Sequence, residues 1–172
     1  LKQPDGLLIF GANLNRAGTK LYIHGRSQYT QQAELWEIDI NTMVARSLNL
    51  GSTAATTGIL RMTITGNDAM GVLSGVTFDN QGAVSDLWLQ KVNLITFSLS
   101  TKTPNLPGSY RNGVVSRSVM NADSTKLYTG HGAVAGSLLE YTISNRSVRA
   151  IDVPGTDNVD NVTYEDGKLY VL

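Results

Sequence analysis

Few residues in this sequence are suited to covalent or metal chemistry. His24 and His131 are the only histidines, and the chain contains no cysteine. Two imidazoles that converge in the fold could bind a metal ion or act as a general base. However, no carboxylate stands beside either histidine at a ligand spacing, and two histidines make an incomplete zinc site. We therefore predict no catalytic residue, no metal site and no cofactor.

Other side chains are suited to binding without chemistry. Trp88 lies in the segment Asp86-Leu87-Trp88-Leu89, and Tyr110 precedes Arg111. Trp88 could form an aromatic binding platform, or it could pack into a core as part of an extra or extended strand. The ring of Tyr110 beside a planar guanidinium could hold a sugar or a carboxylate, or could stabilise a turn. Both interpretations stay open at this stage.

A repeated phrase indicates what positions these residues. Thr19-Lys20-Leu21-Tyr22 returns as Thr125-Lys126-Leu127-Tyr128 and as Gly167-Lys168-Leu169-Tyr170. A second phrase, Leu35 to Met43, aligns with 94–102 and with 138–146. The copies recur every 40–60 residues or so, a spacing typical of propeller blades and of helical arrays. The third copy of the first phrase lies at the end of the chain, so we expect a longer repeat structure.

Strand chemistry decides between these two architectures. Apolar residues alternate with period two, as in Ile38 and Ile40 or Tyr141 and Ile143, which predicts half-buried strands. Clusters of Asn, Asp, Gly and Ser separate the strands and favour tight turns. Each unit is predicted to have four strands, lettered A to D. The second unit is predicted to have its strands at 59–65, 70–75, 94–99 and 103–106. The predicted units span residues 1–51, 52–108, 109–155 and an incomplete 156–172.

Composition limits the classes of partner. The 14 basic and 14 acidic residues give a net charge of zero, and only 16% of residues are charged. A chain without a positive field is a poor nucleic-acid binder, so we expect no nucleic-acid partner. No apolar run approaches the roughly 20 residues of a membrane-spanning helix. The low charge and high Ser, Thr, Asn and Gly content are commoner in secreted and cell-surface β proteins.

The repeated phrases resemble blades of β-propellers. Asp166-Gly167-Lys168-Leu169-Tyr170-Val171 resembles strand B of kelch-type blades, and Leu35 to Thr42 resembles strand C. Bacterial propellers of the Tyr-Val-Thr-Asn class are an equally close pattern. The kelch glycine pair and the tryptophan of strand D are absent. The resemblance implies an all-β fold, a β-propeller of four-stranded antiparallel blades with about three and a half blades present.

The resemblance also implies where binding occurs. In propellers the B–C and D–A loops crowd one face, and here they vary between units while the hairpin turns do not. We expect a non-catalytic binding or scaffold module that recognises a protein or a glycan through these loops. The candidate ligand-binding residues are Arg26, Tyr29, Trp88, Tyr110, Arg111 and His131. The alternatives are part of a carbohydrate-active or oxidoreductase propeller enzyme, or a structural subunit of an assembly.

Two further expectations concern setting and partners. Asn145 and Asn161 begin Asn-x-Ser/Thr sequons, which are possible glycosylation sites and weakly favour an extracellular or cell-surface location. A blade needs neighbours on both faces. We therefore expect this fragment to pack against the remaining blades of the same protein or against a second copy of the chain.

Overall fold

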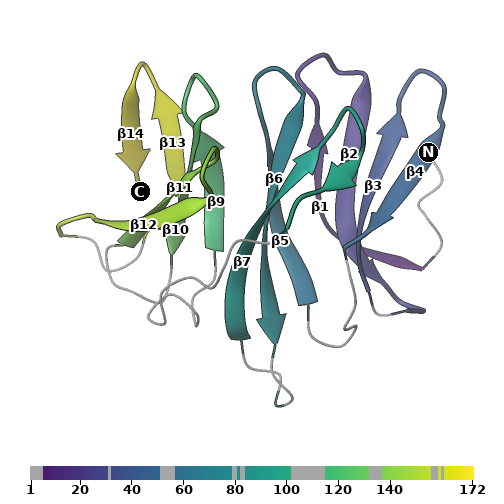
Figure 1. Ribbon diagram of the computed structural model, residues 1–172, viewed down its shortest axis with the longest axis horizontal. Helices are drawn as coiled ribbons and strands as arrows, with labels where there is room; N and C mark the ends of the chain where they lie inside the picture. Colours follow the sequence, from purple (N-terminus) through teal and green to yellow (C-terminus); the bar gives the residue numbers. More distant parts are fainter. Residues whose placement is uncertain are drawn as a thin grey trace.

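The computed structural model describes residues 6–30, 32–50, 57–78, 81, 84–101, 115–131, 137–155, 159 and 161–172. Within these ranges the chain forms strands and no helix, and the strands make four antiparallel sheets that follow one another in chain order (Figure 1). The first three sheets have four strands each and the last has two. In every sheet each strand pairs with the next one in the sequence, as expected for blades.

The first sheet contains β1 (Leu7–Leu14), β2 (Lys20–Ser27), β3 (Ala33–Asp39) and β4 (Ala45–Asn49). The second contains β5 (Thr57–Ile64), β6 (Met70–Phe78), β7 (Val84–Asn93) and β8 (Ser98–Leu99). The third contains β9 (Val115–Met120), β10 (Lys126–His131), β11 (Ser137–Thr142) and β12 (Ser147–Asp152). The last contains β13 (Val162–Glu165) and β14 (Lys168–Val171).

The repeated Lys-Leu-Tyr phrase begins the second strand of a sheet, as predicted. Lys20, Lys126 and Lys168 are the first residues of β2, β10 and β14. The turn before each of the first two copies is closed by an asparagine. The Oδ1 atom of Asn15 accepts the N–H of Lys20, and that of Asn121 accepts the N–H of Lys126, both at 2.9 Å. The recurring sequence therefore encodes a recurring hairpin.

The A–B turns also join neighbouring sheets. Asp68 and Ser124 occupy the same turn position and both have left-handed backbone, with φ values of 57° and 58°. The Asp68 carboxylate accepts the backbone N–H of Arg16 in the preceding sheet at 2.9 Å. The Ser124 hydroxyl accepts the N–H of Gly66 in the same way at 3.2 Å. One edge of the molecule is thus used for sheet-to-sheet contacts.

Apolar side chains fill the space between consecutive sheets. One cluster between the first two sheets includes Leu35, Leu73 and Trp88, and another between the second and third includes Leu89 and Tyr141. The A strands are adjacent along the inner side, because β1 contacts β5, β5 contacts β9 and β9 contacts β13. The first strands of the four sheets therefore lie next to one another along one common inner side.

The predicted C strand of the second sheet is wrong. The C strand is β7, which ends at Asn93, and the predicted C segment 94–99 instead forms the following turn and β8. The side chain of Asn93 accepts the N–H groups of Ile95 and Thr96, as that of Asp39 accepts those of the two residues that open the first C–D turn. Leu94 is thus equivalent to Ile40 in the turn, and its alignment with Leu35 of the C strand was incorrect. The predicted D segment at 103–106 lies outside the described residues.

Candidate functional site

Two predicted ligand-binding residues lie where β2 ends. Arg26 is half-buried within β2, and Tyr29 follows in the turn with 79% of its side chain exposed. The hydroxyl of Ser27 holds this turn by accepting the N–H groups of Tyr29 and Thr30 at 3.3 and 3.2 Å. The ring of Tyr29 lies against Gly6, where a Cβ would collide with it. Tyr29 is thus a supported aromatic side chain with most of its surface available.

Trp88 is placed differently from the loop platform predicted above. It lies within β7 and is 2% exposed, in the core between the first and second sheets. Its ring lies over Gly75 of β6, its partner in the strand register, where a Cβ would overlap the ring atom Cζ2. The interpretation of Trp88 as part of an extended strand is confirmed. A side chain buried in this way offers no surface to a ligand, so the platform prediction is wrong.

The other predicted loop residues are only partly visible. Tyr110 and Arg111 lie outside the described residues. His131 is the last residue of β10, where its backbone pairs with Ser137 and Val115, and its side chain lies outside what the structure describes. Their roles remain predictions.

The two sequon asparagines differ in accessibility. Asn145 is exposed in the turn between β11 and β12, where its Oδ1 accepts the N–H of Ser147 at 3.0 Å. Asn161 is half-buried, and its backbone N–H and C=O both bond to Leu172. A glycan is easier to place on Asn145 than on Asn161.

Two buried carboxylates form equivalent ion clusters that the sequence reasoning missed. Glu37 is 5% exposed and accepts bonds from Lys20, Tyr22 and Arg46 at 3.2, 3.0 and 2.9 Å. Glu140 is also 5% exposed and binds Lys126 and Arg149 at 3.1 and 2.7 Å. The aligned phrases already placed a glutamate at the same step in both copies, which was the available signal.

The electrostatics of these clusters identify them as structural. Burial alone would raise the pKa of Glu37, but the bonds from Arg46, Lys20 and Tyr22 outweigh it and hold that pKa below its usual value. Burial and the neighbouring Glu37 carboxylate raise the pKa of Tyr22. Arg46 continues into the second sheet, where it donates to the carbonyl oxygen of Leu94 and stacks on the ring of Phe97 at 4.4 Å. Arg46 therefore helps to join the first two sheets.

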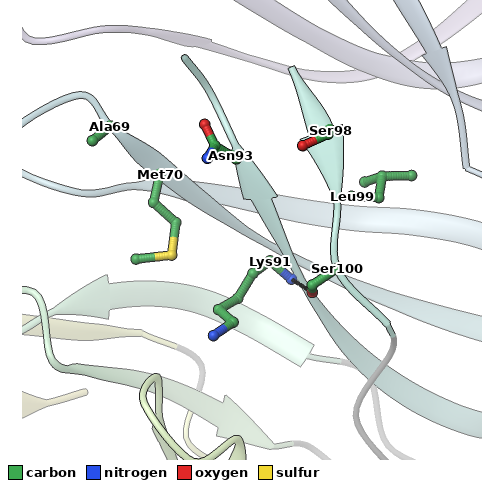
Figure 2. A pocket seen from close by; sticks show the side chains of 7 residues that line it. All are labelled: Ala69, Met70, Lys91, Asn93, Ser98, Leu99 and Ser100. Carbon is green, nitrogen blue, oxygen red and sulfur yellow. Dashed lines mark hydrogen bonds between the residues drawn. The ribbon is translucent and has the colours of Figure 1, made fainter. Parts of the chain in front are cut away.

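The second sheet replaces this cluster with a pocket. Lys91 stands where the first and third sheets have glutamate, and its Nζ donates to the carbonyl oxygen of Ile143 in the third sheet at 3.0 Å. Ser100 stands where the other sheets have arginine, and its hydroxyl accepts the N–H of Lys91, as Figure 2 shows. A pocket of about 420 Å³ results. It is lined by Ala69, Met70, Lys91, Asn93, Ser98, Leu99 and Ser100 (Figure 2).

A second pocket lies along the inner A strands. It measures about 390 Å³ and spans β1, β5 and β9, with one residue contributed by β2. It is lined by Gly11, Ala12, Asn13, His24, Arg61, Met62, Thr63, Arg117 and Ser118. No described lining residue is acidic. This pocket therefore combines two guanidinium groups with a histidine in a concave, cation-rich surface.

His24 is neutral at physiological pH. It is 1% exposed, and burial together with the nearby charge of Arg61 lowers its pKa to about 4. The imidazole packs over Gly11, where a Cβ would stand 2.5 Å from Nε2. Its Nδ1 has no hydrogen-bond partner among the described residues. A buried polar atom of this kind calls for a partner such as a ligand or a water molecule.

The described residues contain neither a cluster of metal ligands nor a membrane-spanning helix. Among them, no group of three or more His, Asp or Glu side chains is close enough together to hold a metal ion. No helix in that part of the chain is long and apolar enough to cross a membrane.

Comparison with known proteins identifies the fold. No protein-family model matches the sequence, and no curated protein matches it. Among solved structures, the chain is similar to the WD40 repeats of RRP9, at 9% identity and a TM-score of 0.62 over 94% of this chain and 42% of that one. It is similar to Kuenenia stuttgartiensis hydrazine synthase, at 10% identity and a TM-score of 0.71 over 94% of this chain and 48% of that one.

A third similar structure is the β-propeller domain of Myceliophteria thermophila Cps50 (Swd1), at 11% identity and a TM-score of 0.65. The match covers 96% of this chain and 50% of that one. The chain therefore spans half or less of the length of these structures. Its fold is all-β, a β-propeller of four-stranded antiparallel blades with about three and a half blades present.

Proposed function

We propose that this chain is part of a non-catalytic binding or scaffold propeller of the kelch-like or Tyr-Val-Thr-Asn kind. It recognises a protein or a glycan through the B–C and D–A loops, at the cell surface or outside the cell. The observation that carries this proposal is Tyr29, an aromatic side chain held 79% exposed in a B–C loop. Exposed tyrosines supply large contact area at low entropic cost, which suits both protein and sugar ligands.

The use of the two edges of the sheets supports this choice. The A–B turns form sheet-to-sheet bonds through Asp68 and Ser124. The ion clusters of Glu37 and Glu140 hold strands B, C and D together. These contacts stabilise a scaffold, and none of these bonds involves Tyr29. We therefore assign the edge with the B–C loops to the partner.

The test is a comparison of matched surface variants in the intact protein. A glycan array and affinity capture with quantitative mass spectrometry would first identify a ligand. Tyr29→Ala and Arg111→Ala should then weaken its binding by about tenfold or more, as expected for an aromatic or arginine anchor. Ile95→Ala removes a side chain that is 73% exposed in a turn of the opposite edge, and should change nothing. Binding that depends on Ile95 and not on Tyr29 would contradict the proposal.

A structural role in an assembly is the second candidate. It is favoured by three consecutive apolar residues of β1, Leu8, Ile9 and Phe10, which are 46%, 44% and 46% exposed. Exposed apolar side chains this close together in the chain are typical of contact sites. Light scattering of the intact protein separates the two functions, because an assembly subunit forms closed dimers or filaments and a binding module stays monomeric without its ligand.

A further inference from the structure

The inner pocket places two arginines at equivalent positions of neighbouring blades. The hairpin bonds that begin at Thr65 and Asn121 fix the alignment of β5 with β9. Counting back from these residues, Arg61 and Arg117 occupy the same step, and Gly11 occupies it in the first sheet. Arg61 and Arg117 therefore occupy equivalent positions on adjacent inner strands, and both line the pocket.

A strand irregularity accompanies this arrangement in each of the three sheets. The register of β1 with β2 shifts between Ile9 and Gly11, and that of β5 with β6 shifts between Ile59 and Arg61. The register of β9 with β10 shifts in the same region, around Arg117. Bulges re-aim the side chains that follow them and are frequent beside binding sites. The repeated bulge gives both arginines the same local geometry.

Neither arginine has a partner in the part of the chain that the structure describes. Arg61 and Arg117 are exposed and form no hydrogen bond or ion pair with a described residue. Arg46 and Arg149, by contrast, are both bound to a buried glutamate. Two like charges that face one cavity without a carboxylate repel each other, and an anion between them would relieve that repulsion.

The first sheet completes the pocket with different residues. Gly11 replaces arginine and leaves room for the imidazole of His24, which packs over it. The Nδ1 of this buried imidazole has no partner among the described residues. His24 therefore adds a polar ring to a wall that already has two cationic groups.

We propose that this pocket binds a small molecule that presents an oxyanion, a carboxylate or a phosphate, to Arg61 and Arg117. The planar forks of two guanidinium groups match the paired oxygens of such groups. A cavity of about 390 Å³ has the size of a small-ligand site and is too small for a folded partner. The pocket lies on the inner strands, away from the B–C loop of Tyr29, so this site and the proposed loop face can each fail without the other.

The test measures binding of defined probes to the intact protein by titration calorimetry. Succinate and inorganic phosphate represent the two sources of the oxyanion, and succinamide is the neutral match of succinate. Saturable binding of succinate or phosphate at a stoichiometry of one supports the proposal, and the stronger of the two identifies the source. Equal binding of succinamide, or no binding of either anion, overturns it.

Variants then locate the site. Arg61→Gln and Arg117→Gln should each weaken anion binding by about tenfold or more, because each removes a charge-assisted contact. Arg16→Gln removes the same charge from an exposed turn outside the pocket and should leave the affinity unchanged within about twofold. Circular dichroism should match the wild type for all three, since these side chains form no hydrogen bond or ion pair in the described structure. Anion affinity that falls with Arg16→Gln as much as with Arg61→Gln would show non-specific attraction and refute the site.

Discussion

Replacing Trp88 by alanine should destabilise the fold, and the structure gives the size of the effect. Trp88 is 2% exposed between the first two sheets, and the side chains around it are themselves buried. Truncation of a fully buried tryptophan removes its packing and leaves a cavity, at a cost of about 3–5 kcal/mol. For a chain of this length, 1 kcal/mol lowers Tm by about 2–4 °C. The expected fall in Tm is therefore roughly 6–20 °C.

Trp36→Ala is the matched control. Trp36 is half-buried on the other side of the first sheet, where it packs beside Ile23 and Ile38, and its Nε1 donates to Glu34. Because part of its surface is already in water, the same truncation should cost clearly less than at Trp88. Urea denaturation followed by fluorescence and circular dichroism measures both variants. A Trp88→Ala protein within about 1 kcal/mol of the wild type would refute the buried placement, because exposed sites rarely cost more.

A double-mutant cycle sharpens this test. A Cβ on Gly75 would overlap the Trp88 ring, so Gly75→Ala should be strongly destabilising in the wild type. The same change should cost much less in the Trp88→Ala background, where the ring is gone. A coupling energy of about 1 kcal/mol or more is expected for residues in direct contact. Additive effects would mean that the two residues do not touch.

Three further predictions concern the charged groups. Glu37→Gln should lower the free energy of unfolding by about 1–2 kcal/mol in urea titrations, because Arg46 and Lys20 lose a buried partner. The loss is moderate because these two side chains are 44% and 33% exposed and regain contact with water. The control Glu165→Gln, on an exposed residue, should change the free energy of unfolding by less than about 0.5 kcal/mol, and equal effects of the two variants would contradict a structural role of the Glu37 cluster. The pKa of His24 falls from 6.5 to about 4 on folding, so the unfolded chain takes up this proton at a higher pH than the folded chain. The free energy of unfolding should therefore decline by about 3 kcal/mol as pH drops from about 6.5 to 4. The difference in free energy of unfolding between the wild type and His24→Gln isolates this contribution, and a difference that does not change with pH would refute it. Arg61→Gln should raise the pKa of His24 in an NMR titration without restoring its ordinary value, because burial is the larger cause of the shift. An unchanged pKa would mean that the charge of Arg61 does not act on the imidazole.

Local sequence signals predicted most of the scaffold. The Lys-Leu-Tyr phrase, the period-two alternation and the Asn-rich turns act over a few residues, and the hairpins of the first and third sheets form where they indicate. The prediction for the second sheet was wrong because Leu94, Phe97 and Leu99 have the spacing of the apolar residues of a C strand. Phe97 in fact has φ of 51° in the C–D turn, the same position as Met43 at 60°. A left-handed backbone is not expected for phenylalanine, so the sequence prediction treated Phe97 as a strand residue and placed the C strand too late in the chain.

The inner pocket could not be predicted for a different reason. Arg61 and Arg117 are 56 residues apart in the sequence and share no obvious motif. Their equivalence depends on the exact start of each A–B turn and on a bulge in each A strand, and a one-residue error in either removes it. The burial of His24 likewise depends on Gly11, which belongs to the neighbouring strand.

The central claim is that the sheets follow one another as blades, with their A strands side by side along the inner face. The chain contains no cysteine, so pairs of introduced cysteines report this arrangement without competing thiols in this part of the protein. The Thr63 hydroxyl on β5 lies 3.5 Å from the backbone oxygen of Ser118 on β9. Ala150 lies on β12, the far strand of the same third sheet.

Disulfide formation in the intact protein under mild oxidation is therefore the decisive measurement. Thr63→Cys combined with Ser118→Cys should form an intramolecular disulfide, detected by peptide mass mapping. Thr63→Cys combined with Ala150→Cys should remain reduced. A disulfide in the second pair and none in the first would contradict the propeller arrangement and every site built on it.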